Sequence, residues 1–300
     1  MLGVVNLDKP VGPTSHDMVG LLRRLTGTRR IGHAGTLDPL ASGVLPILVG
    51  AATRFSEELT GGRKRYDAVV RLGARSATDD AQGPIFDSGA PAPAEAAIRA
   101  ALARFVGTYD QRPPDFSARK QGGTTAHRAA RAGAPIELLP RRVTVEAIEP
   151  VSIEPASGGP GDGLLDVRID VTCGAGTYIR AIARDLGDAL GCGGYLQALR
   201  RTEAAGLRAD DGIRPEQLEA LAAEGRLAEA VQSVGDLLPL PRVTLGGEAA
   251  RLFLHGATQP VDGLADGRAA VYLGDELLGV GRVGAGVLQP EKVVASEVGA

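Results

Sequence analysis

A glycine-rich segment holds the first candidate for chemistry in this chain. Residues 32–43 read GHAGTLDPLASG, and Asp38 stands directly before Pro39. Glycines allow a ligand to approach the backbone closely, and a proline leaves the preceding residue extended while offering its carboxylate no N–H. The pattern therefore predicts an aspartate that is available to a ligand, with a purely structural Asp-Pro turn as the alternative. His33 is open to the same two interpretations, a site residue or a hydrogen-bonded structural group.

An arginine at the start of an expected helix is the second candidate. Residues 173–180 read CGAGTYIR, between a predicted strand and a predicted helix, where backbone N–H groups can bind an anion. Arg180 lies in the first turn, where the helix dipole favours acidic residues, so it is a candidate partner of a specific carboxylate or phosphate. A solvated arginine is the alternative. The segment is not a complete G-x-G-x-x-G and the chain has no Walker A sequence, which disfavours a nucleotide cofactor.

Cationic and aromatic residues stand together at 63–66, RKRY. Such a group could combine phosphate contacts with stacking of Tyr66 on a base, and an ordinary strand tyrosine is the alternative. The four histidines are scattered, and Cys173 and Cys192 form no metal-binding pattern, so we expect no metal site. Together these residues favour an enzyme that acts on an anionic substrate without a cofactor.

The hydrophobic pattern predicts a scaffold of mixed strands and helices around these candidates. In the first part we expect a strand at 2–8, a helix capped by Ser15 and ended by Gly27, a loop at 29–43, strands at 44–49 and 66–72, and a helix at 94–105. Later we expect strands at 143–153 and 164–173, a helix capped by Thr177, a helix at 215–231, a linker at 235–242, a helix at 247–254, and strands at 269–273, 277–283 and 287–294. Strands and helices alternate without regular βαβ spacing, so the predicted fold class is α+β.

Length and charge allow two domains and a polyanionic partner. A chain of 300 residues suits two domains, or one domain with a small appendage. The net charge of −3 argues against a nucleic-acid binder. However, residues 1–142 carry 20 Lys and Arg against 13 Asp and Glu, whereas residues 143–300 carry 13 against 23. The basic part could therefore meet a polyanion. No transmembrane run or signal peptide is visible, so we expect a cytoplasmic protein.

Several motifs resemble one known family. GHAGTLDPLASGVLPILVG at 32–50 is similar to the signature of the tRNA pseudouridine synthase B (TruB) family. The family's order is also followed by LDKPVGPTS at 7–15, KRYDAVVRLG at 64–73, CGAGTYIRAIARDLG at 173–187, GCGGYLQALRRT at 191–202 and LQPEKVV at 288–294. The resemblance covers essentially the whole chain. It implies isomerisation of uridine 55 in the TΨC loop of tRNA to pseudouridine, with base flipping and without a cofactor.

The resemblance also implies roles for single residues. Asp38 matches the catalytic aspartate, which acts as a nucleophile on either the sugar or the base, and Arg180 matches the arginine that keeps it ionised and orients it by a forked hydrogen bond. Tyr66 matches the tyrosine that stacks on the target base and is a candidate for moving a sugar proton. The remaining matches are Tyr178 and Leu199, which line the pocket, and His33, which is associated with the distorted RNA.

At the level of the fold, the resemblance implies a pseudouridine synthase domain at 1–241 with a mixed, mainly antiparallel sheet. Residues 110–142 match a thumb-like RNA-binding insertion, although QGGTTAH at 121–127 replaces a stretch that is often rich in aromatic residues and lysine. Residues 242–300 resemble a small PUA-like β-barrel module. The implied partner is the T-arm of tRNA, bound by a monomer. Two alternatives stay open: a non-catalytic tRNA-binding or tRNA-folding protein on the same scaffold, and a nucleotide-dependent enzyme that uses the loop at 174–177.

Overall fold

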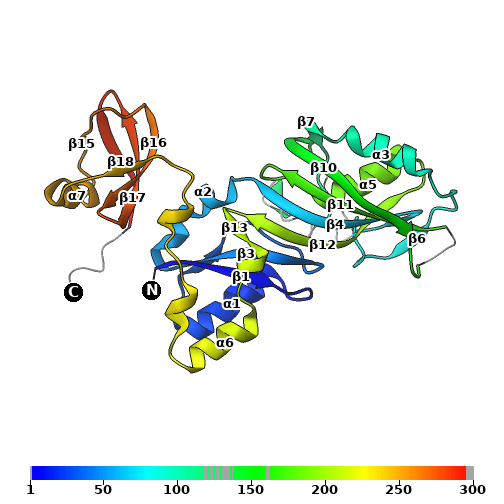
Figure 1. Cartoon of the computed structure of the whole chain (residues 1–300), viewed down its shortest axis with the longest axis horizontal. Helices are drawn as coiled ribbons and strands as arrows, with labels where there is room; N and C mark the ends of the chain where they lie inside the picture. The colour runs from blue at the N-terminus through cyan, green and yellow to red at the C-terminus, as the bar shows by residue number, and fades with distance from the viewer. Residues whose placement is uncertain are drawn as a thin grey trace.

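A long sheet with helices on its faces forms the larger part of the molecule, and a smaller sheet follows at its C-terminal end (Figure 1). The computed structural model describes residues 2–117, 120–121, 124–125, 129, 136, 138–159 and 163–294. The helices are α1 (Ser15–Thr26), α2 (Ser56–Thr60), α3 (Glu95–Ala103), α5 (Ile179–Ala189), α6 (Pro215–Ala223) and α7 (Gly247–Leu254). The strands of the long sheet are β1 (Gly3–Lys9), β2 (Ile31–His33), β3 (Ala41–Val49), β4 (Lys64–Leu72), β7 (Gly107–Gln111), β10 (Arg141–Pro155), β11 (Leu165–Cys173), β12 (Gly194–Ala204) and β13 (Leu207–Arg208).

The strand order of the long sheet is β1-β3-β12-β4-β11-β10-β7, with β2 beside β3 and β13 beside β12. β3 and β12 run parallel, and the other pairs are antiparallel. The predicted α+β class with a mixed, mainly antiparallel sheet is therefore confirmed. The parallel pair sets Leu199 beside Ala41 and Arg201 beside Gly43. A Cβ on Gly43 would lie 2.1 Å from the carbonyl oxygen of Arg201, so only glycine permits this approach.

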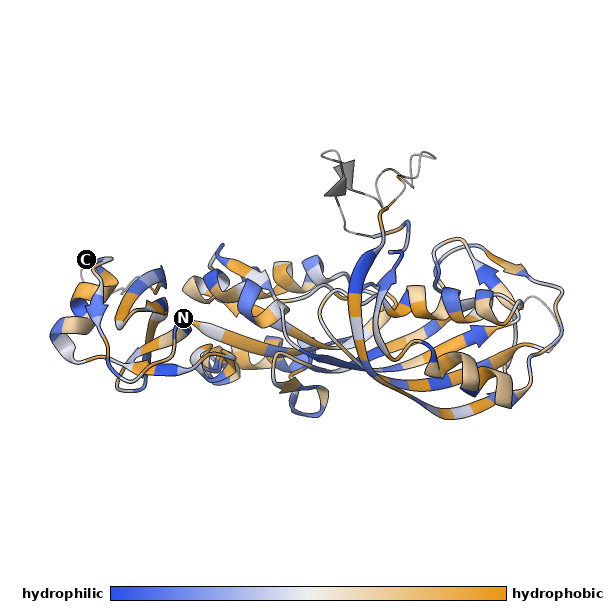
Figure 2. Ribbon diagram, turned by 90° about the horizontal axis from the view of Figure 1, so that it is seen from above, coloured by the Kyte–Doolittle hydropathy of each residue, from blue (hydrophilic) through white to orange (hydrophobic). Residues whose placement is uncertain are grey.

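Alternating side chains on the strands build the core. On β11 the predicted alternation is confirmed, because Val167, Ile169 and Val171 are fully buried. They pack with β4 and with α3 and α5 in one hydrophobic cluster. A second cluster joins β1 and β3 to α1 and α6. Figure 2 shows how polar and apolar residues alternate along the strands.

Helix α1 is capped one residue earlier than predicted. Thr14 Oγ1 accepts a hydrogen bond from Asp17 N (3.1 Å) and Asp17 Oδ2 accepts one from Thr14 N (2.8 Å), which is a capping box. The assignment of Ser15 as the cap is therefore wrong, since Ser15 is the buried first helical residue. Gly27 ends the helix as predicted, with a left-handed φ of 68°.

Three other expectations differ from the structure. The loop predicted at 29–43 contains β2 and the first residues of β3. The helix predicted at 215–231 ends at Ala223, because the chain turns at Gly225 with a φ of 71° before the 3-10 turn Leu227–Ala230. Thr177 does not cap α5: the residue before that helix is Tyr178, which makes no side-chain cap bond.

The C-terminal sheet has the order β14-β16-β17-β18-β15. Its strands are β14 (Arg242–Thr244), β15 (Gln259–Pro260), β16 (Gly267–Leu273), β17 (Glu276–Gly284) and β18 (Val287–Val293), so the predicted helix at 247–254 and the three predicted strands are confirmed to within two residues. The small hairpins β5 (Ala74–Ser76)–β6 (Ile85–Asp87) and β8 (Lys120–Gln121)–β9 (Thr124–Thr125) complete the described strands.

The C-terminal sheet packs on α2 and on the 3-10 helix η1 (Gly50–Phe55) through a shared hydrophobic cluster. At this contact Glu58 of α2, whose side chain is 2% exposed, accepts hydrogen bonds from Lys292 (2.9 Å) and Arg268 (2.5 Å). Between residues 2 and 294, no described helix is both long and apolar enough to cross a membrane.

Candidate active site

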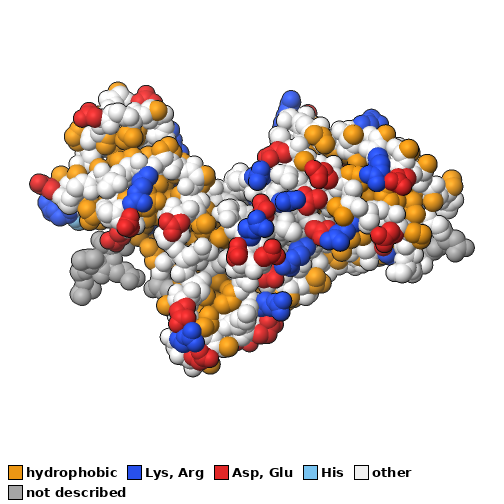
Figure 3. Space-filling view, in the orientation of Figure 1, with side chains coloured by type: hydrophobic (Ala, Val, Ile, Leu, Met, Phe, Trp, Pro, Cys, Tyr) orange, Lys and Arg blue, Asp and Glu red, His pale blue; other side chains and the backbone are white. Residues whose placement is uncertain are grey.

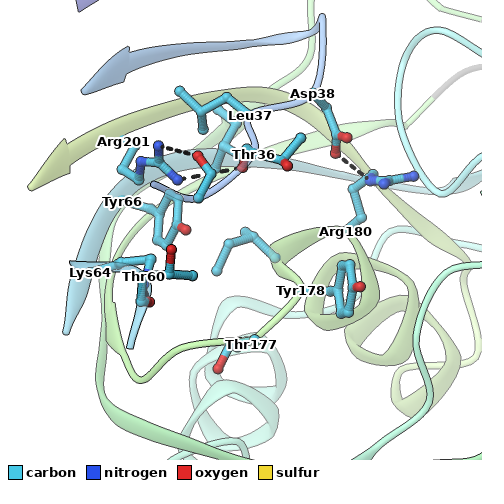
Figure 4. A pocket seen from close by; sticks show the side chains of 14 residues that line it. Thr36, Leu37, Asp38, Thr60, Lys64, Tyr66, Thr177, Tyr178, Arg180 and Arg201 are labelled. Carbon is cyan, nitrogen blue, oxygen red and sulfur yellow. Dashed lines mark hydrogen bonds and ion pairs between the residues drawn. The ribbon is translucent and has the colours of Figure 1, made fainter. Parts of the chain in front are cut away.

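A pocket of about 240 Å³ lies where the aspartate segment, β4, β12 and the start of α5 meet (Figure 4). Five of the six predicted site residues line it: Asp38, Tyr66, Tyr178, Arg180 and Leu199. They come from distant parts of the sequence. The pairing of β12 with β3 and β4, and of β4 with β11, brings them together.

His33 does not line this pocket. It lines a neighbouring hollow that shares Gly35, Thr36 and Thr60 with the pocket wall. Burial lowers the pKa of His33, and the positive charges of Arg201 and His16 lower it further, so the imidazole is neutral at neutral pH. Its Nδ1 is buried and has no hydrogen-bond partner among the described residues.

The backbone around Asp38 is held from three directions. Ser15 Oγ donates to Leu37 O (2.9 Å) and accepts from Leu37 N (2.8 Å). Gly12 N donates to Pro39 O (2.8 Å), and Ala41 N donates to Asp38 O (3.0 Å). The Ser15 hydroxyl at the start of α1 thus fixes the segment that carries the Asp38 carboxylate. The Asp38 side chain is 39% exposed and faces the pocket.

Arg180 meets Asp38 through one nitrogen, so the predicted forked hydrogen bond is wrong. Arg180 Nε lies 2.9 Å from Asp38 Oδ2. Its Nη1 donates to Thr78 O (3.1 Å) and lies 3.7 Å from Asp80 Oδ2, and its Nη2 donates to Phe116 O (3.0 Å). The guanidinium is 6% exposed and is fixed mainly by these backbone carbonyls. It therefore contacts Asp38 through one carboxylate oxygen, Oδ2, while the Asp38 side chain lines the pocket.

Two buried cations line the pocket: Lys64, which belongs to the RKRY group predicted from the sequence, and Arg201, to which the sequence analysis gave no role. Arg201 is 1% exposed, and it donates from Nε to Val44 O (2.7 Å) and from Nη2 to Gly35 O (3.0 Å). Lys64 Nζ donates to Thr60 O (2.7 Å) and to Gly62 O (2.9 Å). Neither forms an ion pair with a carboxylate in the described part of the chain. Arg201 could have been found from its spacing, because residues two apart on a strand share a face and Leu199 already points to the pocket.

The electrostatics of the pocket follow from this burial. Burial lowers the pKa of Lys64 to about 8, and the charge of Arg201 also lowers it. Burial raises the pKa of Tyr66, although the Arg201 guanidinium acts in the opposite direction, so its phenol stays protonated at neutral pH. Three cationic side chains thus face one carboxylate, Asp38, in the lining. The pocket is suited to a substrate with anionic or carbonyl oxygens.

The loop at 174–177 is less open to a phosphate than its sequence indicates. Gln111 Oε1 accepts the N–H of Tyr178 (2.9 Å), and Thr177 Oγ1 donates to Gly174 O (3.1 Å). The guanidinium of Arg141 covers Gly176, where a Cβ would lie 2.2 Å from Nη2. Among the described residues, no three His, Cys, Asp or Glu side chains gather as a metal-binding group.

Comparisons with known proteins agree with this geometry. Residues 23–179 match the TruB family pseudouridylate synthase (N terminal domain), and residues 180–242 match the tRNA pseudouridylate synthase B C-terminal domain. The chain is 42% identical over 299 residues to tRNA pseudouridine synthase B of Ralstonia nicotianae, covering 97% of this chain and 94% of that protein. It is 43% identical over 303 residues to tRNA pseudouridine synthase B of Burkholderia mallei, covering 98% and 97%.

Solved structures show the same fold. The chain superposes on a chain of a Cbf5-Nop10-Gar1 complex with a TM-score of 0.71 and 28% identity, covering 97% of this chain and 84% of that one. A chain of an H/ACA RNP bound to a substrate RNA containing 2′-deoxyuridine superposes with a TM-score of 0.72 and 27% identity, covering 98% of this chain and 86% of that one. The long family matches and the full-length relatives lead to one conclusion: the chain belongs to the TruB family of pseudouridylate synthases.

Proposed function

We propose that this chain converts uridine 55 in the TΨC loop of tRNA to pseudouridine, with Asp38 as the nucleophile. The observation that carries the proposal is the Asp38 carboxylate, which faces a pocket while Arg180 holds one of its two oxygens. Relatives of more than 40% identity that are named tRNA pseudouridine synthase B support the choice of tRNA. An ionised, oriented carboxylate is the form that attacks carbon.

The reaction is an isomerisation, and the pocket residues can account for its steps. The bond between C1′ and N1 of uracil breaks and a bond between C1′ and C5 forms, while N1 gains a proton and C5 loses one. Asp38 attacks either the sugar or the base, and both routes begin from the carboxylate that Arg180 contacts. Tyr66 and Tyr178 offer aromatic faces to the flipped base, and Leu199 adds apolar contact. His33 lies one hollow away, where it can contact the distorted RNA next to the target.

The proposal extends to the other parts of the chain. We assign residues 1–241 to the catalytic domain, 110–142 to an RNA-binding insertion, and 242–300 to a PUA-like RNA-binding module. Within the insertion, residues 118–119, 122–123, 126–128, 130–135 and 137 lie outside the described residues, and these include most of the divergent stretch at 121–127. We further propose a monomer that binds the T-arm of tRNA in the cytoplasm.

The test uses a T-arm stem-loop transcript and maps pseudouridine by position. Asp38→Asn should abolish turnover while the RNA affinity stays close to that of the wild-type chain. Asp67→Asn is the matched control, because Asp67 pairs with Arg168 on the opposite, exposed face of the sheet and should leave the rate unchanged. An active Asp38→Asn variant would refute the proposed nucleophile.

The same assay separates the two alternatives. A wild-type chain that binds the stem-loop without modifying it would be the non-catalytic RNA-binding protein. Activity of thoroughly desalted protein without added nucleotide would exclude a nucleotide-dependent enzyme. The occupied N–H of Tyr178 already disfavours that enzyme.

A further inference from the structure

We infer, on the basis of the proposed function, that Gln111 is a positioning residue that fixes the backbone of Tyr178 in the wall of the pocket. Gln111 is the last residue of β7 and is 1% exposed, and it does not line the pocket. Its Oε1 accepts the N–H of Tyr178 (2.9 Å), and its Nε2 donates to the carbonyl oxygen of Tyr178 (3.1 Å). One side-chain amide therefore satisfies both backbone groups of Tyr178, as a neighbouring strand would.

The chemistry of this contact requires glutamine. A backbone N–H needs an acceptor and a backbone C=O needs a donor, so the two backbone groups of Tyr178 determine the orientation of the Gln111 amide, whose Nε2 also donates to Tyr109 Oη (3.3 Å). A glutamate would keep the acceptor, but its carboxylate could not donate to the carbonyl. A leucine of similar size would leave both backbone groups without this partner.

Tyr178 depends on this contact because little else holds it. It precedes α5 with an extended backbone (φ −102°, ψ 112°) and makes no side-chain cap bond. The segment before it, 174–177, contains two glycines. Its carbonyl also accepts the first bond of the helix, from Ile182 N (3.2 Å), but its N–H is held by Gln111. A shift of Tyr178 would also move the first turn of α5, which carries Arg180.

Two residues that follow Gln111 in the chain also bind α5 through their backbone carbonyl oxygens. Phe116 O accepts from Arg180 Nη2 (3.0 Å), and Arg112 O accepts from Arg184 Nη2 (2.9 Å). On the adjacent strand β10, Arg141 is the register partner of Gln111, and its guanidinium covers Gly176. Both strands that border residues 112–140 therefore contact the 176–178 segment. These contacts join the pocket wall at 176–178 to the end of β7 and the start of β10, and the buried Gln111 lies between them.

The experiment compares Gln111→Leu and Gln111→Glu with the wild-type chain on a T-arm stem-loop. We measure the single-turnover rate of pseudouridine formation, the Kd for the RNA, and hydrogen exchange at the Tyr178 amide. Thr108→Val is the matched control, because it removes a side-chain hydrogen bond to Thr144 (3.0 Å) from the same strand without contacting Tyr178. The control should keep the wild-type rate, Kd and exchange.

For Gln111→Leu we expect the single-turnover rate to fall by about 10- to 100-fold with a Kd within about threefold of wild type, because a displacement of about 1 Å can cost about 100-fold in rate. Exchange at the Tyr178 amide should be faster. For Gln111→Glu, the ratio of its rate to that of the wild type should rise as the pH falls from about 8 to about 6. Protonation of the buried glutamate restores a donor for the Tyr178 carbonyl, and a merely structural residue would not give this trend.

A Gln111→Leu variant with the wild-type rate, a parallel loss of rate and affinity, or a flat pH ratio for Gln111→Glu would overturn the inference. If the wild-type chain makes no pseudouridine, the proposed function fails. Hydrogen exchange at the Tyr178 amide then tests the positioning role of Gln111 by itself. Faster exchange in Gln111→Leu but not in Thr108→Val supports the positioning contact, and unchanged exchange refutes it.

Discussion

The anchoring of the aspartate segment by Arg201 gives the sharpest prediction. Arg201→Met removes the buried guanidinium while keeping a side chain of similar length. The carbonyl oxygens of Val44 and Gly35 then lose their donors, at 2.7 Å and 3.0 Å. The third contact, to Thr36 O at 3.5 Å, is too long to add much. Gly35 is three residues before Asp38, so the loss directly reaches the segment that carries this carboxylate.

The magnitude follows from the two carbonyls. Each buried acceptor without a partner costs about 1–3 kcal/mol, which gives about 2–6 kcal/mol together. Removing the charge offsets part of this, because a buried guanidinium is costly to desolvate, so we expect about 2–4 kcal/mol. Arg201→Lys keeps the charge and one hydrogen bond, and should cost about half as much. A shift of Asp38 by about 1 Å would also lower the single-turnover rate of Arg201→Met by about 100-fold.

Urea unfolding measures the first effect and single-turnover kinetics the second. Arg208 on β13 gives the control, because its side chain is 63% exposed and lies 3.8 Å from the exposed carboxylate of Asp210, so Arg208→Met should cost no more than about 1 kcal/mol. If Arg201→Met unfolds like the Arg208→Met control and turns over at the wild-type rate, Arg201 does not anchor the segment and the reasoning is wrong.

Three further outcomes follow from the charged groups. Arg180→Ala should lower the single-turnover rate by about 100-fold or more because Asp38 loses its orienting partner, and a near-normal rate would contradict that pairing. Burial lowers the pKa of Lys64 to about 8 from 10.5, so the free energy of unfolding should rise between these pH values by about 3 kcal/mol, and Lys64→Met should remove this rise in urea titrations. Burial raises the pKa of Glu58, but hydrogen bonds from the C-terminal sheet, including that of Lys292, lower it more. The net pKa is below 4.5, so this contact stabilises the protein above that pH and is lost as the pH falls through the folded pKa. Calorimetry of Glu58→Gln at acid pH should show a flatter loss of stability than the wild type shows.

The fold class, most strands and the candidates Asp38, Tyr66 and Arg180 could be predicted from local signals, whereas the pocket-lining roles of Tyr178 and Leu199 came only from the family resemblance. Alternating apolar residues mark β11, and Gly27 marks the end of α1. Where two neighbouring residues could do the same task, the local signal failed. Thr14 and Ser15 can both cap a helix, and the choice depends on Leu37, which lies 22 residues away and takes the Ser15 hydroxyl.

The geometry of the site depended on contacts between distant residues. A forked Arg180–Asp38 bond is a reasonable expectation for an arginine beside a carboxylate. In the structure, the other two guanidinium nitrogens of Arg180 donate to Thr78 O and Phe116 O. No sequence spacing could predict these contacts. Gln111 is a similar case, because its partner is 67 residues away and is a backbone group, which has no residue-type signal.

The distribution of ion pairs explains why the net charge of the chain is a poor guide to its partner. Basic and acidic side chains alternate over the central strands on the exposed face of the sheet (Figure 3), where Arg65 pairs with Asp170 and Arg168 pairs with Asp67. These arginines are neutralised locally, so they add little to the field at a distance. In the pocket, by contrast, Arg201 is buried against carbonyl oxygens, which supply no opposite charge. Among the described residues, the buried cations of the pocket therefore add to the field at Asp38, and a chain with a net charge of −3 can present a positive pocket to an anionic substrate.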